Sequence, residues 1–366
     1  MKTQRIESVD ILRGFTITAM ILVNTPGSWS HVYTPLLHAE WHGLTPTDLI
    51  FPFFLFIVGI SIYFSFNNKS NSSSTYKKII IRSLKLLGLG LFLNAFSPNY
   101  PFVEEIATMR FPGILQRIGC VFLVSSILFL NCNWKSLLVI CVSVLIGYWL
   151  FIGFMPFPNS EIIRPTFDRA PNNWVNYIDL KIFGNHLWQK DYDPEGFFST
   201  IPAIISCVFG ILVAHILHRI NLNMRVIYMV ALSLILFVLG YVFNNWFPIN
   251  KAIWSSSFVL VTTGWATLIL AAIYFLTDIL NFKFGSIFKY VGMNAIGIYF
   301  ISSIISKSFY LIKVGEYNIH SYMYDSIFVH SVLSDKLASL LYALTAVMFY
   351  LFLAYFLAKK KIFIKV

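Results

Sequence analysis

The sequence predicts an all-α, polytopic membrane protein with about ten transmembrane helices. Hydrophobic residues make up 57% of the 366-residue chain and charged residues only 12%, roughly half the charged fraction of a soluble domain. The apolar residues form continuous stretches of roughly twenty, the length that a helix needs to cross a bilayer, and not the short alternating segments of a membrane β-barrel. We therefore expect one transmembrane domain over residues 1–366, integral to a lipid bilayer.

Each predicted span has a recognisable start. The spans begin near Ile11, Asp48, Ile79, Pro112, Ser136, Ser199, Val226, Trp254, Phe288 and Lys336. Charged residues and a glycine interrupt the first apolar stretch, which also lacks a signal-peptide cleavage pattern, so we expect it to stay in the membrane. One outer insert, at about 157–198, is too polar to span a bilayer and too aromatic for a flexible linker.

The charges divide unevenly between the two predicted sides. With the N-terminus in the cytoplasm, the inner segments hold basic clusters such as 77–78 and 359–361 but only three of the sixteen acidic residues, Glu7, Asp10 and Asp278. This asymmetry follows the positive-inside rule and predicts that both termini are cytoplasmic. The net charge of +11 therefore faces anionic lipid, and no nucleic-acid partner is expected.

A polar side chain lies near the outer end of the first predicted span. Asn24 is followed by Pro26 and Gly27, which break the helix and leave its last carbonyl groups without partners. An asparagine amide both donates and accepts hydrogen bonds. Asn24 could therefore hold a carbonyl oxygen or orient a histidine, and a simple polar contact between helices is the alternative.

The stretch LLHAEWHGLTPTDLIFPFF, residues 36–54, places two histidines beside a helix start. Asp48 follows a Thr-Pro-Thr run that is typical of a helix N-terminus, where the helix dipole favours a carboxylate. A carboxylate there could accept from the N–H of His38 or His42 and strengthen the imidazole as a base or nucleophile. An ordinary solvated loop with interfacial Trp41 is the alternative. A zinc site would need a third ligand that no nearby cluster supplies, so no metal is expected.

Further polar residues mark the outer ends of other predicted spans. They are Arg110, Gln116 and Arg117 before and within the fourth, Asp193 and Glu195 before the sixth, Lys251 and Trp254 at the eighth, and Asn294 within the ninth. Charged groups inside hydrocarbon cost roughly 2.5–3.5 kcal/mol each on insertion scales. A polar void in the outer half of the bundle is the simplest reason to keep them.

Taken together, these stretches resemble the heparan-α-glucosaminide N-acetyltransferase family, including its bacterial members. The resemblance runs in order through SVDILRGF, HAEWHGLTPTDLIFPFFLFIVG, RFPGILQRIG, YDPEG, NKAIWS, GMN and KKKIFIKV. More loosely, VDILRG with a polar residue near the end of the first span resembles the acyltransferase type 3 family. The resemblance implies a membrane enzyme, in a bacterial cytoplasmic membrane, that carries acetyl from cytosolic acetyl-CoA to the amine of a glucosamine-type sugar outside.

The resemblance also suggests roles for individual residues. It places the key histidine at His38 and its asparagine partner at Asn24, while Asp48 would orient or charge-tune the site. The histidine either carries the acetyl group, in a ping-pong route, or only removes a proton from the acceptor amine. Candidate groups for acetyl-CoA are Arg117, Arg110, Gln116, Asn294, Arg82 and Lys85. Candidate groups for the sugar are Trp41, Asp193, Glu195, Lys251 and Trp254. A homodimer is compatible with this interpretation.

Two other classes of function remain open at the level of sequence. The same intramembrane polar groups could line the pathway of a transporter for amino sugars or related solutes. A structural or assembly protein of the envelope would have neither activity.

Overall fold

The computed structural model describes residues 6–158, 164–283 and 285–364, and these form an almost entirely helical protein. Within these ranges the strands are β1 (Lys313–Val314) and β2 (Tyr317–Asn318), which pair as one antiparallel hairpin. The predicted all-α fold class is thus confirmed. Part of the predicted insert, residues 159–163, and the basic residues Lys2, Arg5 and Lys365 lie outside the described residues.

In chain order the helices are α1 Glu7–Asn24, α2 Ile50–Phe66, α3 Ser73–Ala95, α4 Ile114–Asn131, α5 Trp134–Phe154, α6 Trp174–Phe183, α7 Thr200–Arg219, α8 Leu222–Phe243, α9 Ser256–Tyr274, α10 Ser286–Met293, α11 Ala295–Leu311, α12 Ile319–Ile327 and α13 Asp335–Lys359. The connections between helices range from one residue, between α10 and α11, to the 25 residues 25–49 between α1 and α2. Short helical turns, η1 Thr34–Leu36 and η2 Pro46–Leu49, precede α2, η3 Gly184–His186 follows α6, and η4 Phe275–Ile279 extends α9.

A helix, or a broken pair of helices, lies at each of the ten predicted span positions, and the count of ten spans stays a prediction. Seven described helices are long and apolar enough to cross a membrane on their own, and α10 with α11 makes an eighth if the pair is one broken span. At two further predicted positions lie α1 and α3, whose charged residues exclude them from that count. The predicted ninth span is not one straight helix, because α10 and α11 meet at an angle of 81° around Asn294.

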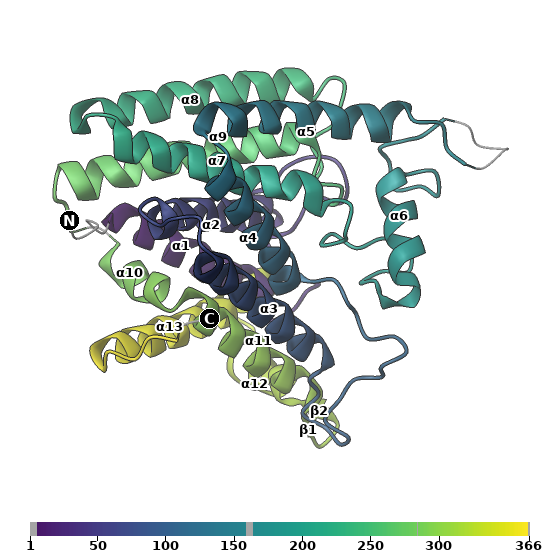
Figure 1. The fold of residues 1–366 in the computed structure, drawn as a ribbon. Coiled ribbons are helices and arrows are strands. Elements are labelled where there is room, and N and C mark those ends of the chain that lie inside the picture. Colours follow the sequence, from purple (N-terminus) through teal and green to yellow (C-terminus); the bar gives the residue numbers. More distant parts are fainter. Residues whose placement is uncertain (1–5, 159–163, 284, 365–366) are drawn as a thin grey trace.

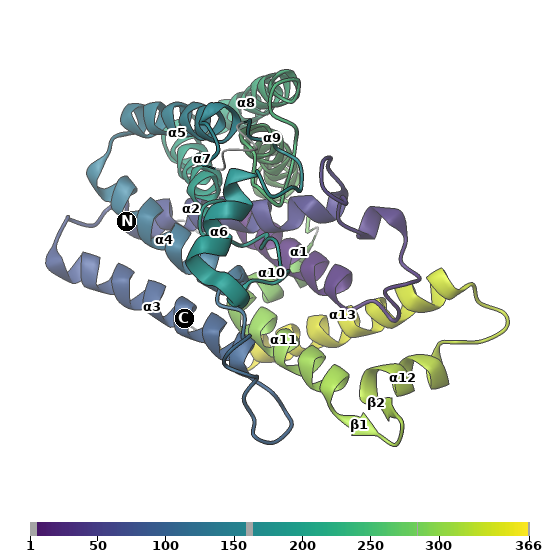
Figure 2. The same ribbon diagram turned by 90° about the vertical axis from the view of Figure 1, so that its right-hand side faces the viewer.

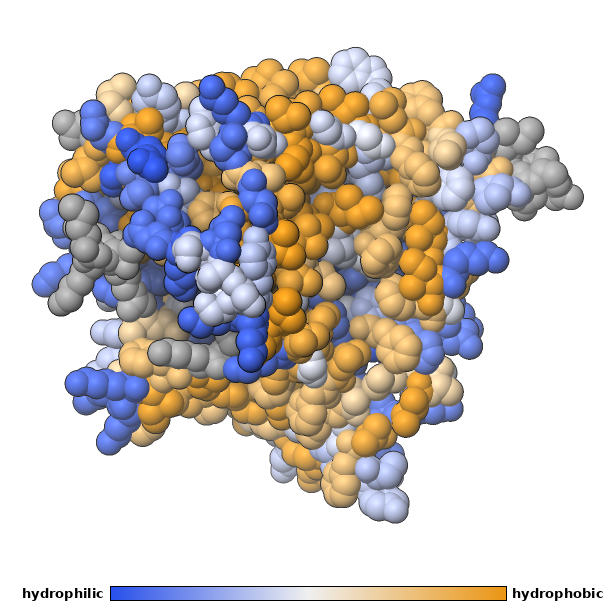
Figure 3. Space-filling model, in the orientation of Figure 1, coloured by the Kyte–Doolittle hydropathy of each residue, from blue (hydrophilic) through white to orange (hydrophobic). Residues whose placement is uncertain are grey.

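The helices form two groups with α1 and α2 between them. Figures 1 and 2 show α5, α7, α8 and α9 side by side in one group, and α11, α12 and α13 in the other. The insert that carries α6 projects at the end of the bundle opposite the N-terminus (Figure 1). Hydrophilic residues gather toward the left and right edges in Figure 3, with a hydrophobic band between them. A membrane would surround that band.

Close helix contacts in the centre depend on glycine. A Cβ added at Gly59 of α2 would lie 1.9 Å from the carbonyl oxygen of Cys207 in α7, and one at Gly210 would lie 1.9 Å from the carbonyl oxygen of Phe56. The backbones of α2 and α7 therefore touch, as small residues permit in membrane helices.

We expect Gly59→Ala to lower the free energy of unfolding by about 1–3 kcal/mol, the usual cost of overpacking. Gly147→Ala in α5 is the matched control, because a Cβ at that position has no atom within 4 Å. Thermal unfolding in detergent measures both variants. Equal melting temperatures for the two would contradict the close contact of α2 with α7.

Hydrogen bonds at the end of the bundle that holds the N-terminus fasten α1 to its neighbours. Asp278, in η4 after α9, accepts from the backbone N–H groups of Glu7 at 3.1 Å and Ser8 at 3.0 Å. Lys289 of α10 pairs with the Glu7 carboxylate at 2.9 Å. Asp278 therefore satisfies free donors at the start of α1.

Candidate functional site

The carboxylate of Asp48 holds His38 in place. Its Oδ1 lies 2.7 Å from His38 Nδ1, and its Oδ2 accepts from the backbone N–H groups of Ala39 and Thr45. Thr45 and Asp48 also form the capping box that begins η2, so the helix start that the sequence predicted fixes this carboxylate. The Asp48 side chain is 1% exposed, whereas that of His38 is 50% exposed. The buried Asp48 carboxylate therefore holds the His38 imidazole in a position that solvent can reach.

This geometry selects one form of the neutral imidazole. An ionised carboxylate only accepts hydrogen bonds, so Asp48 favours a proton on His38 Nδ1. The other ring nitrogen, Nε2, then carries the lone pair. A histidine held in this way can accept a proton or act as a nucleophile.

Lys251 completes a triad of ionisable groups. Its Nζ lies 3.0 Å from His38 Nδ1, 3.2 Å from His38 Nε2 and 3.7 Å from Asp48 Oδ1. The preceding Asn250 holds the loop before α9, since its backbone and side chain bond to Ser255 and Ile253. Burial lowers the pKa of Lys251, although the Asp48 carboxylate opposes that change. Lys251 was predicted to bind substrate, and the structure places it directly against His38.

The second histidine of the stretch has a different environment. His42 Nε2 lies 2.8 Å from Oδ1 of Asp168, a residue of the insert whose side chain is 72% exposed. The indole N–H of Trp41 donates to the carbonyl of Phe167 at 2.9 Å. Trp41 and His42 therefore fasten the insert, whereas His38 remains open.

Arg110 forms ion pairs with Asp193 and Glu195. From the sequence, Arg110 was expected to bind acetyl-CoA and the two acidic residues were expected to bind the sugar. Its guanidinium donates to both carboxylate oxygens of Asp193 and to Glu195. Asp193 is fully buried and also accepts from the backbone N–H groups of Trp188 and Glu195. Burial opposes ionisation of Glu195, but the charges of Arg110, Arg117 and Lys251 hold its pKa below the usual value. Glu195 thus pairs with Arg110 and also lies within electrostatic reach of Arg117 and Lys251.

Arg117 lies between these clusters, deep in the bundle. Its guanidinium stands 5.0 Å from the ring centre of Trp254 and donates to the carbonyl of Gly196 and to Ser199. Its Nε and Nη1 have no hydrogen-bond partner among the described residues. Trp254 is fully buried and donates to Ser206, so it supports Arg117 and has no exposed face for a sugar.

A buried carboxyl group in α6 makes the stability of the fold depend on pH. Burial raises the pKa of Asp179 from 3.8 to about 6, although the N–H of Phe198 and the charge of Arg117 oppose this. Because burial disfavours the ionised form, the protonated carboxyl of Asp179 contributes its full stabilisation below about pH 4. This stabilisation is lost as the pH rises through about 6.

We expect Asp179→Asn to remove roughly 3 kcal/mol of this pH dependence, the equivalent of the shift in the pKa of Asp179. Melting temperatures of the natural chain and the variant, measured between pH 4 and pH 7, test this. The natural chain should lose stability relative to Asp179→Asn across that range. Parallel melting curves would show that Asp179 is not the group responsible.

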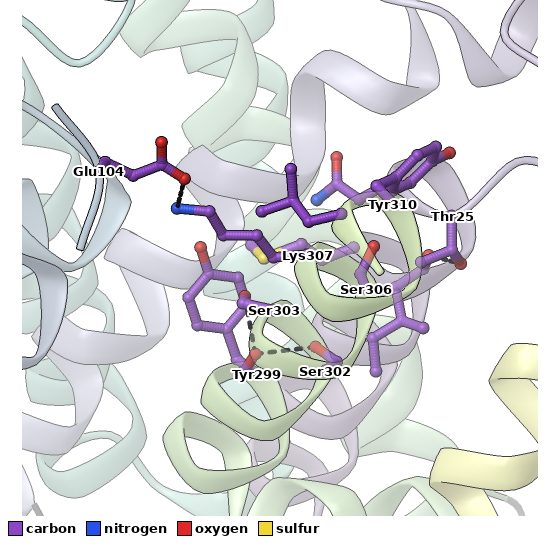
Figure 4. A pocket seen from close by; sticks show the side chains of 12 residues that line it. Thr25, Glu104, Tyr299, Ser302, Ser303, Ser306, Lys307 and Tyr310 are labelled. Atoms are coloured by element: carbon purple, nitrogen blue, oxygen red, sulfur yellow. Dashed lines mark hydrogen bonds and ion pairs between the residues drawn. The ribbon is translucent and has the colours of Figure 1, made fainter. Parts of the chain in front are cut away.

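Asn24 lines a separate cavity whose wall combines polar and apolar side chains. The cavity has a volume of about 400 Å³ and lies between α1 and α11, and its lining includes Asn24, Tyr299, Ser302, Ser306 and Lys307. Figure 4 shows Lys307 pointing toward Glu104, with which it pairs at 3.1 Å. Within the described residues no hydrogen bond joins Asn24 to His38.

The remaining predicted residues are spread along the bundle. Gln116 donates to the carbonyl of Phe111 and packs on Gly90 of α3. Asn294 makes hydrogen bonds with the chain after α13. Arg82 lies over the ring of Phe122, with 4.7 Å from its guanidinium carbon to the ring centre.

Lys85 lines a second cavity, of about 510 Å³, between α3 and α11. The structure therefore brings His38, Asp48 and Lys251 into contact. It joins Arg110, Asp193 and Glu195 in a second cluster, and it places Asn24, Asn294, Arg82 and Lys85 elsewhere.

Several residues of the site were not predicted from sequence. Asp168 and Asn250 contact His42, and Lys307 and Glu104 line the Asn24 cavity. Of these residues, Lys307 could have been found from the sequence, because a lysine within an apolar helix indicates a functional site. In the described ranges no group of three His, Cys, Asp or Glu side chains is arranged to hold a metal ion.

Residues 5–227 match the family profile described as "Heparan-alpha-glucosaminide N-acetyltransferase, catalytic". The chain belongs to the heparan-α-glucosaminide N-acetyltransferase family. The human protein of that name is 31% identical over 354 residues, covering 81% of this chain and 52% of the human one. The mouse protein is 28% identical over 422 residues, covering 99% of this chain and 60% of its own. The chain thus spans little more than half of these relatives.

The family match includes most of the site. Residues 5–227 contain Asn24, His38, Asp48 and the Arg110 cluster, whereas Lys251 lies beyond the matched residues. The resemblance on which the expected roles of His38 and Asn24 rested is therefore confirmed at the level of the family.

Proposed function

We propose that this protein is a transmembrane acetyltransferase that moves acetyl from acetyl-CoA to the amine of a glucosamine-type sugar through His38. The observation that carries the proposal is the exposed His38 imidazole on the buried Asp48 carboxylate. The names of the human and mouse relatives support an N-acetyl product and a glucosamine acceptor. A bacterial cytoplasmic membrane is the proposed location.

The donor would approach from the end of the bundle that holds the N-terminus. Arg82 lies within electrostatic reach of Arg13, and its buried Nε has no hydrogen-bond partner among the described residues. Arg13 already pairs with Asp10 at 3.0 Å, so an additional anion would meet chiefly the Arg82 guanidinium, a group suited to phosphate. We therefore assign the phosphate groups of acetyl-CoA to this region, with Lys85 one turn further along α3.

The acetyl group would be transferred at the opposite end. In the direct route, the sugar amine attacks the thioester carbonyl carbon, the C–S bond breaks, and coenzyme A leaves as the thiolate. His38 Nε2 takes the proton of the amine, and Asp48 stabilises the imidazolium that results. In the ping-pong route, Nε2 attacks the thioester carbonyl carbon first, the C–S bond breaks and coenzyme A leaves as the thiolate. The sugar amine then attacks the acetyl carbon, the bond to the imidazole breaks, and the freed Nε2 takes the proton of the amine.

Lys251 and Asn24 have distinct roles in this scheme. The Lys251 ammonium, next to both His38 nitrogens, would stabilise the oxyanion that develops on the thioester carbonyl. The Asn24 cavity, with its hydroxyl and amide lining, would hold the part of the donor next to the acetyl group. The exposed face of His38 is left for the sugar, beside Trp41.

One experiment separates this proposal from the transporter alternative. Purified protein in vesicles is given radiolabelled acetyl-CoA on one side and glucosamine on the other. We expect label in N-acetylglucosamine and none in vesicles that lack the protein. Uptake of unmodified glucosamine without acetylation would establish a transporter, and absence of both activities would favour a structural protein.

A further inference from the structure

The chain reverses direction after α13 and returns to the bundle. The N–H of Ile362 donates to the carbonyl of Leu357 at 2.9 Å, and that of Lys361 donates to the carbonyl of Ala358 at 3.0 Å. Lys361 adopts a φ of 57°, the left-handed conformation that ends many helices. The turn therefore directs the segment Ile362–Ile364, hereafter the return segment, back along the protein.

The return segment binds the break between α10 and α11. The side-chain amide of Asn294 donates to the carbonyl of Ile362 at 3.0 Å and accepts from the N–H of Ile364 at 2.8 Å. One amide thus pairs with the return segment through both its donor and its acceptor. A broken span leaves polar groups in an apolar region, and other parts of the protein must satisfy them.

A side-chain contact fixes the register of this pairing. A Cβ added at Gly297 of α11 would lie 2.8 Å from a methyl carbon of Ile364, so the bare glycine accommodates that isoleucine. Ile364 also forms part of the cavity between α3 and α11. Phe363 and Ile364 keep similar exposed fractions, 43% and 40%, but of the two only Ile364 meets Gly297 and lines this cavity.

We propose that the return segment is a positioning element that sets the angle of α11 and thereby the shape of the Asn24 cavity. Tyr299, Ser302 and Ser306 of α11 line that cavity, whereas Gly297 meets Ile364. Because the return segment contacts the first turn of α11, it fixes where the later residues of α11 lie in the cavity wall. The consequence for donor binding rests on the proposed function, but the consequence for the shape of the cavity does not.

A labelling experiment tests the positioning directly. Ser306→Cys places a thiol in the cavity, and its rate of reaction with a maleimide is compared with that in a chain ending at Lys361. We expect the rate to change at least threefold on removal of the return segment. The same truncation with Ser306 intact corrects for reaction at the exposed Cys120. An unchanged rate would overturn the proposal, whether or not the protein is an acetyltransferase.

Kinetics in the chain with its natural Ser306 provide the second test. We expect Ile364→Asp to raise KM for acetyl-CoA at least fivefold with a smaller change in kcat, and Phe363→Ala to leave both unchanged. A peptide of sequence KKIFIKV, added to the truncated protein, should restore the natural KM, whereas a scrambled peptide should not. Higher activity after truncation, with inhibition by the peptide, would show that the segment instead blocks the site.

Discussion

Replacing Asp48 with asparagine is expected to reduce the rate of acetyl transfer by about 10²–10⁴, the range attributed to acid–base catalysis. Asparagine keeps the shape and one acceptor oxygen, so the capping contact with Thr45 can persist. The negative charge that favours a proton on His38 Nδ1 is lost, however, and an imidazolium would lack its counter-ion. His38→Ala should reduce transfer at least as much. Radiolabel transfer to glucosamine measures both variants.

The chain offers a matched control for this result. Asp168 forms the other histidine–carboxylate pair, at 2.8 Å from His42, but 72% of its side chain is exposed. Asp168→Asn should change the rate less than about threefold, since an exposed pair contributes little. Near-natural activity in Asp48→Asn, or an equal loss in Asp168→Asn, would remove the special role of the His38 pair.

The pairing of His38 with Asp48 could be predicted because it is local. The Thr-Pro-Thr-Asp sequence specifies a helix start, and His38 lies only ten residues before the carboxylate. Short-range capping chemistry gave the orientation of Asp48 without knowledge of the fold. The same reasoning could not distinguish His38 from His42. That difference comes from Asp168, which lies 126 residues from His42.

Contacts between distant segments were beyond the reach of sequence patterns. Lys251 meets His38 across 213 residues, and only the folded arrangement of the helices brings them together. The break at Asn294 is the second case. The residues around Asn294 are apolar and predict one continuous span. The hydrogen-bond partners of the Asn294 amide lie about seventy residues later in the chain. Burial of Trp254 likewise depends on neighbours that the sequence does not reveal.

Arg110→Ala should be the most destabilising single change in the site, at about 3–5 kcal/mol. The substitution leaves the carboxylates of Asp193 and Glu195, 0% and 9% exposed, without the cation that both contact. Removing one member of a buried ion cluster leaves an uncompensated charge in a poorly solvated place. Arg110 also ties the segment before α4 to the segment before α7, so the insert should loosen.

Arg169→Ala provides the control, because Arg169 makes a similar two-point contact with Asp191 at side chains that are 44% and 48% exposed. It should cost no more than about 1 kcal/mol, the usual value for a surface pair. The buried thiols of Cys141 and Cys207 can report unfolding through a thiol-reactive dye during a temperature ramp in detergent. A much lower melting temperature for Arg110→Ala than for Arg169→Ala is the expected result. Similar melting temperatures would mean that solvent reaches Asp193 and Glu195, and that the Arg110 cluster does not hold the insert on the bundle.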